Sequence, residues 1–187
     1  MNLIILGPQG SGKGTQAKLL AEKFGLTHIS TGELMRKEID SGSNFGKEIK
    51  AIINNGDLVS DEILFSILEK TPFKDGNGFI LDGTPRNLLQ AKALEKVFAK
   101  VGISLDHVIF IDIPHDVSVA RMLKRAEIEH RPDDTLEAIN KRLAIYEKET
   151  KPVIDYYRNE NKIIDIDGAP DINTIFLNIV SKLESKI

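Results

Sequence analysis

Five short apolar segments mark out the chain, at residues 3–6, 27–30, 79–82, 108–113 and 162–166. Most of them run without polar alternation, which is typical of strands buried on both faces of a parallel sheet. Between the segments, apolar residues recur at helical spacing, as at Ala17, Leu20, Ala21 and Phe24. Alternating strands and helices predict an α/β fold, a three-layer α/β/α sandwich around a five-stranded parallel sheet. Ligands of such sheets bind beyond the carboxyl ends of the strands.

Polar residues at capping spacing predict where two of the helices begin. Ser30 and Glu33 stand three apart before a helix, as in a capping box, and Asp134 and Glu137 repeat this spacing further on. The helix after Asp134 is expected to end at Pro152, because proline interrupts helical hydrogen bonding.

The stretch between the second and third predicted strands contains only helical patterns. Residues 31–72 therefore predict a helical insertion, which is longer than a simple crossover between two strands requires. We expect this insertion to form a subdomain above the loop that follows the first strand.

That loop is glycine-rich and carries a lysine. Gly7-Pro8-Gln9-Gly10-Ser11-Gly12-Lys13-Gly14-Thr15 matches the G-x-x-x-x-G-K spacing of a phosphate-binding loop between a strand and a helix. Its backbone N–H groups and the helix amino terminus favour a polyphosphate, and Lys13 adds a cation. The motif departs from the usual form, because residue 14 is glycine and the hydroxyl comes at Thr15. The alternative is a glycine-rich turn with an incidental lysine.

An aspartate and several arginines suggest what else surrounds the loop. Asp82 ends the third strand, where phosphate-loop enzymes hold Mg²⁺ through water, although it could instead cap the following turn. The chain has seven arginines against eighteen lysines, and six of the arginines fall in segments expected near the loop. These six are Arg36, Arg86, Arg121, Arg125, Arg131 and Arg142. Converging arginines favour phosphoryl transfer between two phosphorylated substrates, whereas each taken singly could be a solvated surface residue.

Composition excludes several other classes of function. The net charge of −3 argues against a broad nucleic-acid surface, and the lack of cysteine excludes disulfides, thiolate catalysis and cysteine-ligated zinc. The four histidines show no metal-ligand spacing, and no residue set suggests a covalent nucleophile. The first apolar run is too short for a signal peptide or a membrane span, so a cytoplasmic protein is expected.

The chain resembles the adenylate kinases, which carry out ATP + AMP ⇌ 2 ADP, over nearly its whole length. Four motifs in order carry the resemblance: the loop from Gly7 to Gln16, Ser30-Thr31-Gly32-Glu33, Asp82-Gly83-Thr84-Pro85-Arg86 and Arg131-Pro132-Asp133-Asp134. The family shares the glycine–threonine departure at residues 14 and 15. The resemblance implies a P-loop NTPase type of fold and one kinase domain over residues 1–187. Its parts would be a core (1–29, 60–125 and 132–187), an AMP-binding insertion (30–59) and a short lid (126–131).

The resemblance also implies site residues, substrates and cofactor. ATP would be bound by Gly10, Ser11, Gly12, Lys13, Gly14, Thr15, Arg121 and the backbone at Pro170. AMP would be bound by Thr31, Arg36, Asp57, Leu58, Val59, Gly83, Thr84, Pro85, Arg86, Gln90, Arg131 and Arg142, with Gln90 reading the adenine edge. Lys13, Arg86, Arg125, Arg131 and Arg142 would be catalytic, and Asp133 and Asp134 would orient the arginines. Mg²⁺ would accompany ATP at Asp82 through water, without zinc, in a monomer that binds neither nucleic acid nor membrane.

Two residues differ from the family pattern, and two other classes of protein are alternatives to this interpretation. Thr84 replaces the usual aromatic residue, and Asp57 replaces a residue that is more often basic. A pyrimidine monophosphate kinase is the nearer rival, but Thr31 and Gln90 favour AMP over UMP or CMP. A GTP-dependent switch protein would read guanine with N-K-x-D, and the only similar run, from Asn161 to Asp165, has the wrong spacing.

Overall fold

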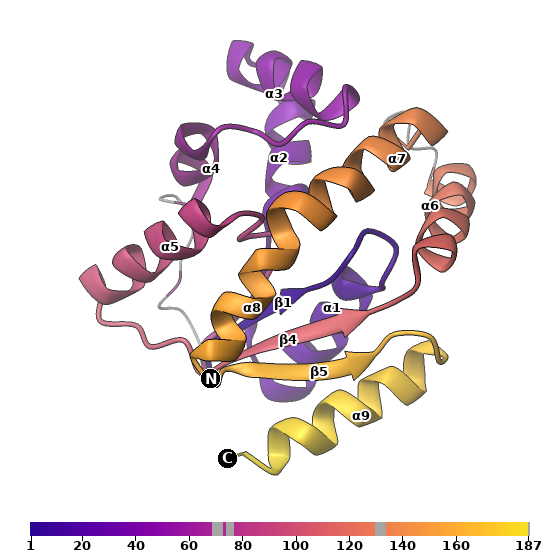
Figure 1. Cartoon of the computed structure of the whole chain (residues 1–187). Helices are drawn as coiled ribbons and strands as arrows, with labels where there is room; N and C mark the ends of the chain where they lie inside the picture. Colours follow the sequence, from indigo (N-terminus) through magenta and orange to yellow (C-terminus); the bar gives the residue numbers. More distant parts are fainter. Residues whose placement is uncertain (69–72, 74–76, 130–133, 187) are drawn as a thin grey trace.

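The computed structural model describes residues 1–68, 73, 77–129 and 134–186. Within these residues the chain forms one sheet of five parallel strands (Figure 1). Their order across the sheet is β2 (Thr27–Ser30), β3 (Phe79–Asp82), β1 (Leu3–Leu6), β4 (His107–Asp112) and β5 (Ile163–Asp167). The predicted parallel sheet is confirmed, with the bounds of β4 and β5 shifted by one residue.

The central strand β1 supplies both faces of the core because its side chains alternate. Leu3 and Ile5 pack with residues of the helices α1 (Lys13–Phe24) and α9 (Ile172–Glu184), which cover one face of the sheet. All four residues of β1 are buried, as a strand covered on both faces requires.

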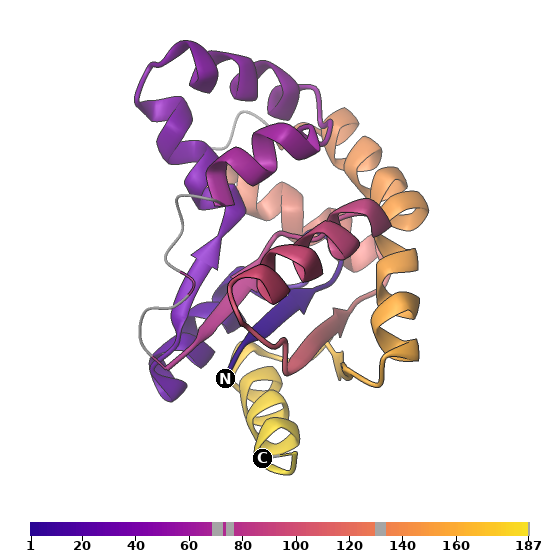
Figure 2. The ribbon, with the colours of Figure 1, turned by 90° about the vertical axis from the view of Figure 1, so that its left-hand side faces the viewer.

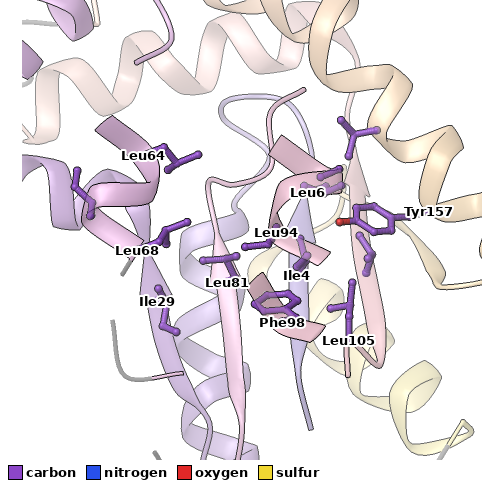
Figure 3. Packing of buried hydrophobic residues seen from close by; sticks show 14 of the residues in the cluster. Ile4, Leu6, Ile29, Leu64, Leu68, Leu81, Leu94, Phe98, Leu105 and Tyr157 are labelled. Carbon is purple, nitrogen blue, oxygen red and sulfur yellow. The ribbon is translucent and has the colours of Figure 1, made fainter. Parts of the chain in front are cut away.

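Ile4 and Leu6 point to the opposite face and join the larger apolar cluster. There they pack with residues of α4 (Asp61–Leu68), α5 (Leu88–Lys100) and α8 (Lys151–Asn159). Figure 3 shows Leu94 and Phe98 of α5 and Tyr157 of α8 gathered over β1. Helices on both faces confirm the predicted three-layer arrangement.

The helices α2 (Thr31–Asp40) and α3 (Asn44–Asn54) project beyond the carboxyl ends of the strands (Figures 1 and 2). Ser30 begins α2, where its side chain accepts a hydrogen bond from the Glu33 N–H at 3.3 Å. The predicted helix start at this position is confirmed. The Glu33 carboxylate, however, pairs with Lys18 of α1 at 2.8 Å.

The predicted helix end at Pro152 is wrong. Helix α7 (Leu136–Ile145) passes through a π-helical turn, η1 (Tyr146–Thr150), directly into α8, and Pro152 lies in the first turn of α8. A proline ring inside an α-helix clashes with the carbonyl four residues earlier. The wider π turn shifts that register, so the chain remains helical past the proline.

The predicted cap at Asp134 and Glu137 is also wrong, by one residue. Thr135 is the N-cap of α7, and its Oγ1 accepts from the Ala138 N–H at 3.2 Å. Asp134 is instead turned into the protein with its side chain fully buried, where it binds two arginines. None of the helices in the described ranges is long and apolar enough to cross a lipid bilayer.

Candidate active site

The loop between β1 and α1 forms a concave backbone surface at the carboxyl end of the sheet. Gly12 is the left-handed N-cap of α1, with φ of 86° and no atom within 4 Å of where a Cβ would stand. On the other side of the loop, a Cβ on Gly7 would collide with the carbonyl of Ile111 in β4. Glycine is therefore required at Gly7 by the neighbouring strand and at Gly12 by the turn, which leaves open space above the helix amino terminus.

Lys13 lies at this amino terminus within a group of charged residues. Its Nζ donates to the Pro8 carbonyl at 2.8 Å, which folds the side chain back over the loop. Burial lowers the pKa of Lys13 to about 8; Asp82 opposes this shift, and Arg86 and Arg125 add to it. A lysine among cations favours a ligand that carries several negative charges.

Asp82 at the end of β3 lies against the first turn of α1. A Cβ built on Gly14 would come within 3.3 Å of Asp82 Oδ2. Residue 14 is therefore close to the carboxylate, and Thr15, which follows it, keeps an exposed side chain. Hard oxygen donors of this kind suit Mg²⁺, which keeps water and substrate phosphates as its other ligands. In the described part of the chain no three acidic or histidine side chains form a metal-binding group.

Two arginines share one buried carboxylate on the other side of the site. Asp134 Oδ2 accepts from Arg125 of α6 (His115–Glu129) at 2.5 Å, and Asp134 Oδ1 accepts from Arg142 of α7 at 2.6 Å. Arg142 also donates to the Ile53 carbonyl of α3 at 3.1 Å. Asp134 thus fixes two guanidinium groups from different helices relative to one another.

Arg121, one turn before Arg125 on α6, contacts the loop that follows β5. Its guanidinium donates to the carbonyls of Gly168 at 2.9 Å and Ala169 at 3.2 Å. The backbone of Gly10 lies beside it, because a Cβ there would be 3.4 Å from Arg121 Cβ. The structure therefore brings the phosphate-binding loop, Arg121 and the segment leading to Pro170 together.

A second group of residues meets where α2 begins beside the end of β3. Thr31 Oγ1 donates to the Asp82 carbonyl at 3.2 Å and accepts from Thr84 Oγ1 at 3.3 Å. Arg86 Nε donates to the Gly83 carbonyl at 2.8 Å. Burial lowers the pKa of Arg86, Asp82 raises it, and Arg142 lowers it further. Asp82 and Arg142 are therefore near enough for their charges to act on Arg86, which links this group to the rest of the site.

Arg36 belongs to the same group. A Cβ on Gly32 would be 3.6 Å from the Arg36 guanidinium, so this side chain folds back along the first turn of α2. A Cβ on Gly83 would be 3.8 Å from the Arg86 guanidinium and 3.8 Å from the Gly32 N–H nitrogen. Two arginine forks therefore flank the amino terminus of α2, which also favours an anion.

Gln90 in the first turn of α5 is 3% exposed and completes this side of the site. Its Oε1 accepts from the Arg86 N–H at 2.8 Å, and its Nε2 donates to Asp61 Oδ1 at 3.0 Å. The stretch Asp57-Leu58-Val59 lies between α3 and α4, where the Asp57 carboxylate pairs with Lys141 of α7 at 2.7 Å.

Sequence reasoning missed three residues that hold this arrangement. They are Asp61, which binds the Gln90 amide; Lys141, which pairs with Asp57; and Thr150 in the π-helical turn, whose Oγ1 donates to the Arg86 carbonyl at 2.7 Å. Each acts on a residue distant in the chain, and no local pattern distinguishes it. The predicted site residue Arg131 lies outside the described residues, as do Pro132 and Asp133 of the same motif.

A glycine loop at a helix amino terminus, with a lysine, a strand-end aspartate and arginines around it, defines the class of protein. The chain is an α/β protein of the phosphate-binding-loop class, built to bind polyphosphate. Comparison with known proteins gives the family. A family model described as adenylate kinase matches residues 5–162, and the chain belongs to the adenylate kinase family.

Three relatives named adenylate kinase illustrate the match. The chain is 44% identical to one from Stenotrophomonas maltophilia over 98% of this chain and 100% of that protein. It is 42% identical to one from Phocaeicola vulgatus over 98% of both proteins. A relative from Prochlorococcus marinus is 43% identical over 97% of this chain and 98% of its own length. The similarity therefore extends over all of the elements described above.

Proposed function

We propose that the chain transfers the terminal phosphoryl group of ATP reversibly to AMP, giving two molecules of ADP. Family membership supports this activity, and one feature of the site carries it. Asp82, Arg86 and Arg125 all lie close enough to Lys13, at the mouth of the phosphate-binding loop, for their charges to act on it. Phosphoryl transfer depends on such an arrangement, because positioning and charge stabilisation supply most of its catalysis.

The ATP side of the proposed site is built on the loop and α6. The backbone from Gly10 to Thr15 would hold the phosphates, and Lys13 would follow the transferred group. Arg121 would lie along the adenine, and the backbone at Pro170 would accept a hydrogen bond from it. The bonds from Arg121 to the Gly168 and Ala169 carbonyls support this role, since they join the arginine to that loop.

The AMP side would be built from the start of α2, the loop after β3 and the segment before α4. Arg36 and Arg86 would grip the α-phosphate beside the amino terminus of α2, and Gln90 would read the adenine edge. The other residues proposed to line this side are Thr31, Asp57, Leu58, Val59, Gly83, Thr84 and Pro85. The position of the Arg36 fork next to Gly32 and of the Arg86 fork next to Gly83 supports this division.

Between the two nucleotides, cations would stabilise the charge of the transferring group directly, without a phosphoenzyme. Lys13, Arg86, Arg125, Arg131 and Arg142 are the proposed catalytic residues, with Asp134 orienting Arg125 and Arg142. A guanidinium keeps its charge throughout the reaction and offers two parallel donors to phosphate oxygens. Asp134 supports this by presenting one oxygen to each arginine.

Mg²⁺ fits the site at Asp82. The carboxylate lies against the first turn of α1 beside Gly14, and Asp82 would hold the ion through water. When bound, Mg²⁺ neutralises phosphate charge and aligns the phosphates for transfer.

Residues 30–59 and 126–131 are proposed as the AMP-binding insertion and a short lid on a core of residues 1–29, 60–125 and 132–187. Closure of both would exclude water and prevent transfer of the phosphoryl group to it. The projection of α2 and α3 from the sheet supports a separate insertion (Figure 2). We also propose that the protein is a monomer, since both nucleotide sites are assembled within one chain. We propose in addition that it is cytoplasmic.

A coupled assay of ADP formation tests the activity directly. With Mg²⁺ and ATP held constant, AMP should be turned over far better than UMP, CMP or GMP. Preference for UMP or CMP would overturn the assignment to AMP. Absence of turnover with all four would overturn phosphoryl transfer itself.

Arg86→Lys separates the proposed role of Arg86 from a structural one. Lysine keeps the charge but loses the planar fork, so activity should fall about a hundredfold or more while the melting temperature changes little. Losses of activity and stability in equal proportion would make Arg86 a structural residue.

A further inference from the structure

The side-chain amide of Gln90 is held at both ends by groups of opposite hydrogen-bonding character. At one end its Oε1 accepts from the backbone N–H of Arg86 at 2.8 Å. At the other its Nε2 donates to Asp61 Oδ1 at 3.0 Å. Asp61 belongs to α4 and Gln90 to α5, so two helices define the orientation of one amide.

Neither partner tolerates the amide turned over. A backbone N–H can only donate, and an ionised carboxylate can only accept. Rotating the Gln90 amide by half a turn would place its N–H₂ against the Arg86 N–H and its oxygen against the Asp61 carboxylate. At 3% exposure water cannot fill the lost bonds easily, so the orientation seen here is strongly preferred.

Once fixed, the amide still has hydrogen-bonding capacity for a ligand. An amide group offers two N–H donors and two acceptor lone pairs. Arg86 uses one lone pair and Asp61 one N–H. One donor and one acceptor remain, side by side and in a set order.

Only one kind of purine edge matches that order. The Watson–Crick edge of adenine presents the N1 acceptor beside the exocyclic N6–H donor. Hypoxanthine and guanine present the reverse, an N1–H donor beside the O6 acceptor. An amide fixed in the orientation that pairs with adenine cannot pair with a 6-oxopurine. Its N–H would face the N1–H donor of that base, and its oxygen would face the O6 acceptor.

We propose that Asp61 is a positioning residue that determines base specificity, because it locks the Gln90 amide in the orientation that accepts a 6-aminopurine and rejects a 6-oxopurine. This deepens the proposed function and rests on it, since it assumes that Gln90 faces the base of the monophosphate. Asp61 itself does not contact the substrate; it acts through Gln90.

Asp61 could also serve only as an acidic residue in the first turn of α4. Negative side chains at that position stabilise a helix through its dipole. Glu62 stands next to it in the same turn and is exposed, whereas the Gln90 amide bonds to the Arg86 N–H and to Asp61, so Glu62 offers the same charge to the helix without holding that amide. Asp61 and Glu62 are therefore a matched pair for experiment.

The test compares Asp61→Asn with Glu62→Gln in the full chain. Asparagine has the shape of aspartate but can accept or donate, so it no longer opposes the turned amide. The ratio of kcat/KM for AMP to that for IMP, the 6-oxopurine analogue, should narrow by roughly tenfold in Asp61→Asn, since one of two restraints is lost. The change should lie in the KM of the monophosphate, with the KM of ATP unchanged. Glu62→Gln should keep the wild-type ratio.

The same Asp61→Asn substitution, made in a variant that lacks the Gln90 amide, shows whether Asp61 changes the AMP to IMP ratio through Gln90. In Gln90→Leu the amide is absent, and adding Asp61→Asn should not change the AMP to IMP ratio further. Direct binding of AMP and IMP, measured by calorimetry, should follow the same pattern as the kinetic ratio. A thermal melt of each variant shows that the proteins compared are folded.

The proposal is overturned if Asp61→Asn, folded and active, keeps the wild-type ratio, or if it shifts the ratio equally in the Gln90→Leu background. An equal shift in Glu62→Gln would also overturn it, since helix stabilisation would then explain the effect. Failure of the wild-type chain to phosphorylate AMP is a different result and overturns the proposed function instead.

Discussion

Asp82 and Gly14 lie so close that a side-chain carbon at position 14 would come within 3.3 Å of Asp82 Oδ2. The approach explains why this loop departs from the usual phosphate-binding motif. A serine or threonine at position 14 would crowd the carboxylate at the end of β3. The hydroxyl instead comes one residue later, at Thr15, where the side chain is exposed.

Gly14→Ser should therefore reduce activity although it restores the common form of the motif. The added carbon and hydroxyl displace the Asp82 carboxylate, and misplacement of a catalytic group by a fraction of an ångström lowers kcat/KM by about tenfold or more. Helix stability should not fall, because serine is a better helix former than glycine. Steady-state kinetics over a range of Mg²⁺ concentrations, with a thermal melt alongside, check both expectations. Unchanged kinetics would show that the site accommodates the side chain.

Asp134→Ala should destabilise the protein strongly. The carboxylate is fully buried, and its removal takes away the charged group that binds both Arg125 and Arg142. Breaking a buried pair costs about 3–5 kcal/mol, and partial exposure of Arg125 reduces this to roughly 2–4 kcal/mol. Urea unfolding measures the free energy directly.

Glu147→Gln is the control for that measurement. Glu147 pairs with Lys151 at 2.9 Å, but both side chains are more than half exposed. An exposed pair of this kind contributes less than about 0.5 kcal/mol. Equal losses in the two variants would show that burial of Asp134 does not strengthen its interaction with the arginines.

How far the sequence predicted this structure depends on the range of each interaction. The strands, the loop from Gly7 to Thr15 and the start of α2 at Ser30 follow from local patterns, and the structure has them. The π-helical turn was not predicted, because its sequence, Tyr146 to Thr150, contains ordinary helix formers and Pro152 reads as a stop. The spacing of Asp134 and Glu137 places the cap of α7 one residue early, because Asp134 has the right chemistry for a cap but faces inward.

The contacts between distant elements that hold Gln90 and Asp57 could not be predicted from local patterns. Asp61 and Gln90 are 29 residues apart and meet only because α4 and α5 pack on the same face of the sheet. Asp57, in the segment that follows α3, and Lys141, on α7, lie further apart still in the sequence. Single-sequence patterns contain no information on such pairs, so only a structure reveals them.

Lys13→Met should abolish activity and yet stabilise the ligand-free protein at neutral pH. Burial lowers the pKa of Lys13 to about 8, so below pH 8 the folded protein must keep a half-buried ammonium whose desolvation outweighs the attraction of Asp82. Methionine removes this cost, a gain on the order of 1 kcal/mol or a few degrees in melting temperature.

The pH dependence of that gain follows from the direction of the shift. Below about pH 8 both folded and unfolded chains hold the proton, so the cost is complete. Between about 8 and the ordinary value of 10.5, the folded chain releases the proton first and the cost declines. Urea unfolding of both proteins at pH 7 and pH 10 should therefore show a larger difference at pH 7. A difference that grows with pH would contradict the lowered pKa.

Asp57→Lys should weaken AMP binding through the contact with α7. The substitution puts two lysines together where Asp57 and Lys141 now pair at 2.7 Å. Both side chains are about half exposed, so the effect on stability should stay below about 1 kcal/mol and diminish with salt. The KM for AMP should rise a few-fold, because the backbone of Asp57 to Val59 is displaced. Combining Asp57→Lys with Lys141→Asp exchanges the two charges and should restore the wild-type KM for AMP at low salt. If the raised KM persists in the double variant, the ion pair does not hold this segment.

Thr84→Val tests the residue that stands where an aromatic side chain is usual in the family. Thr84 is 2% exposed, and its Oγ1 donates to Thr31 Oγ1, which in turn donates to the Asp82 carbonyl.

Valine has the same shape as threonine but cannot donate, so Thr84→Val should lose about 1 kcal/mol of stability and raise the KM for AMP with kcat nearly unchanged. Thr84→Ser keeps the donor and should keep the KM, although it loses a methyl group. Thr84→Phe should cost about 1–3 kcal/mol, because Thr84 is almost fully buried and a ring adds volume to a packed site. Urea unfolding and AMP titration of the three variants separate hydrogen bonding from packing. If Val and Ser behave alike, the hydroxyl chain from Thr84 to Asp82 has no part in positioning the AMP-side loop.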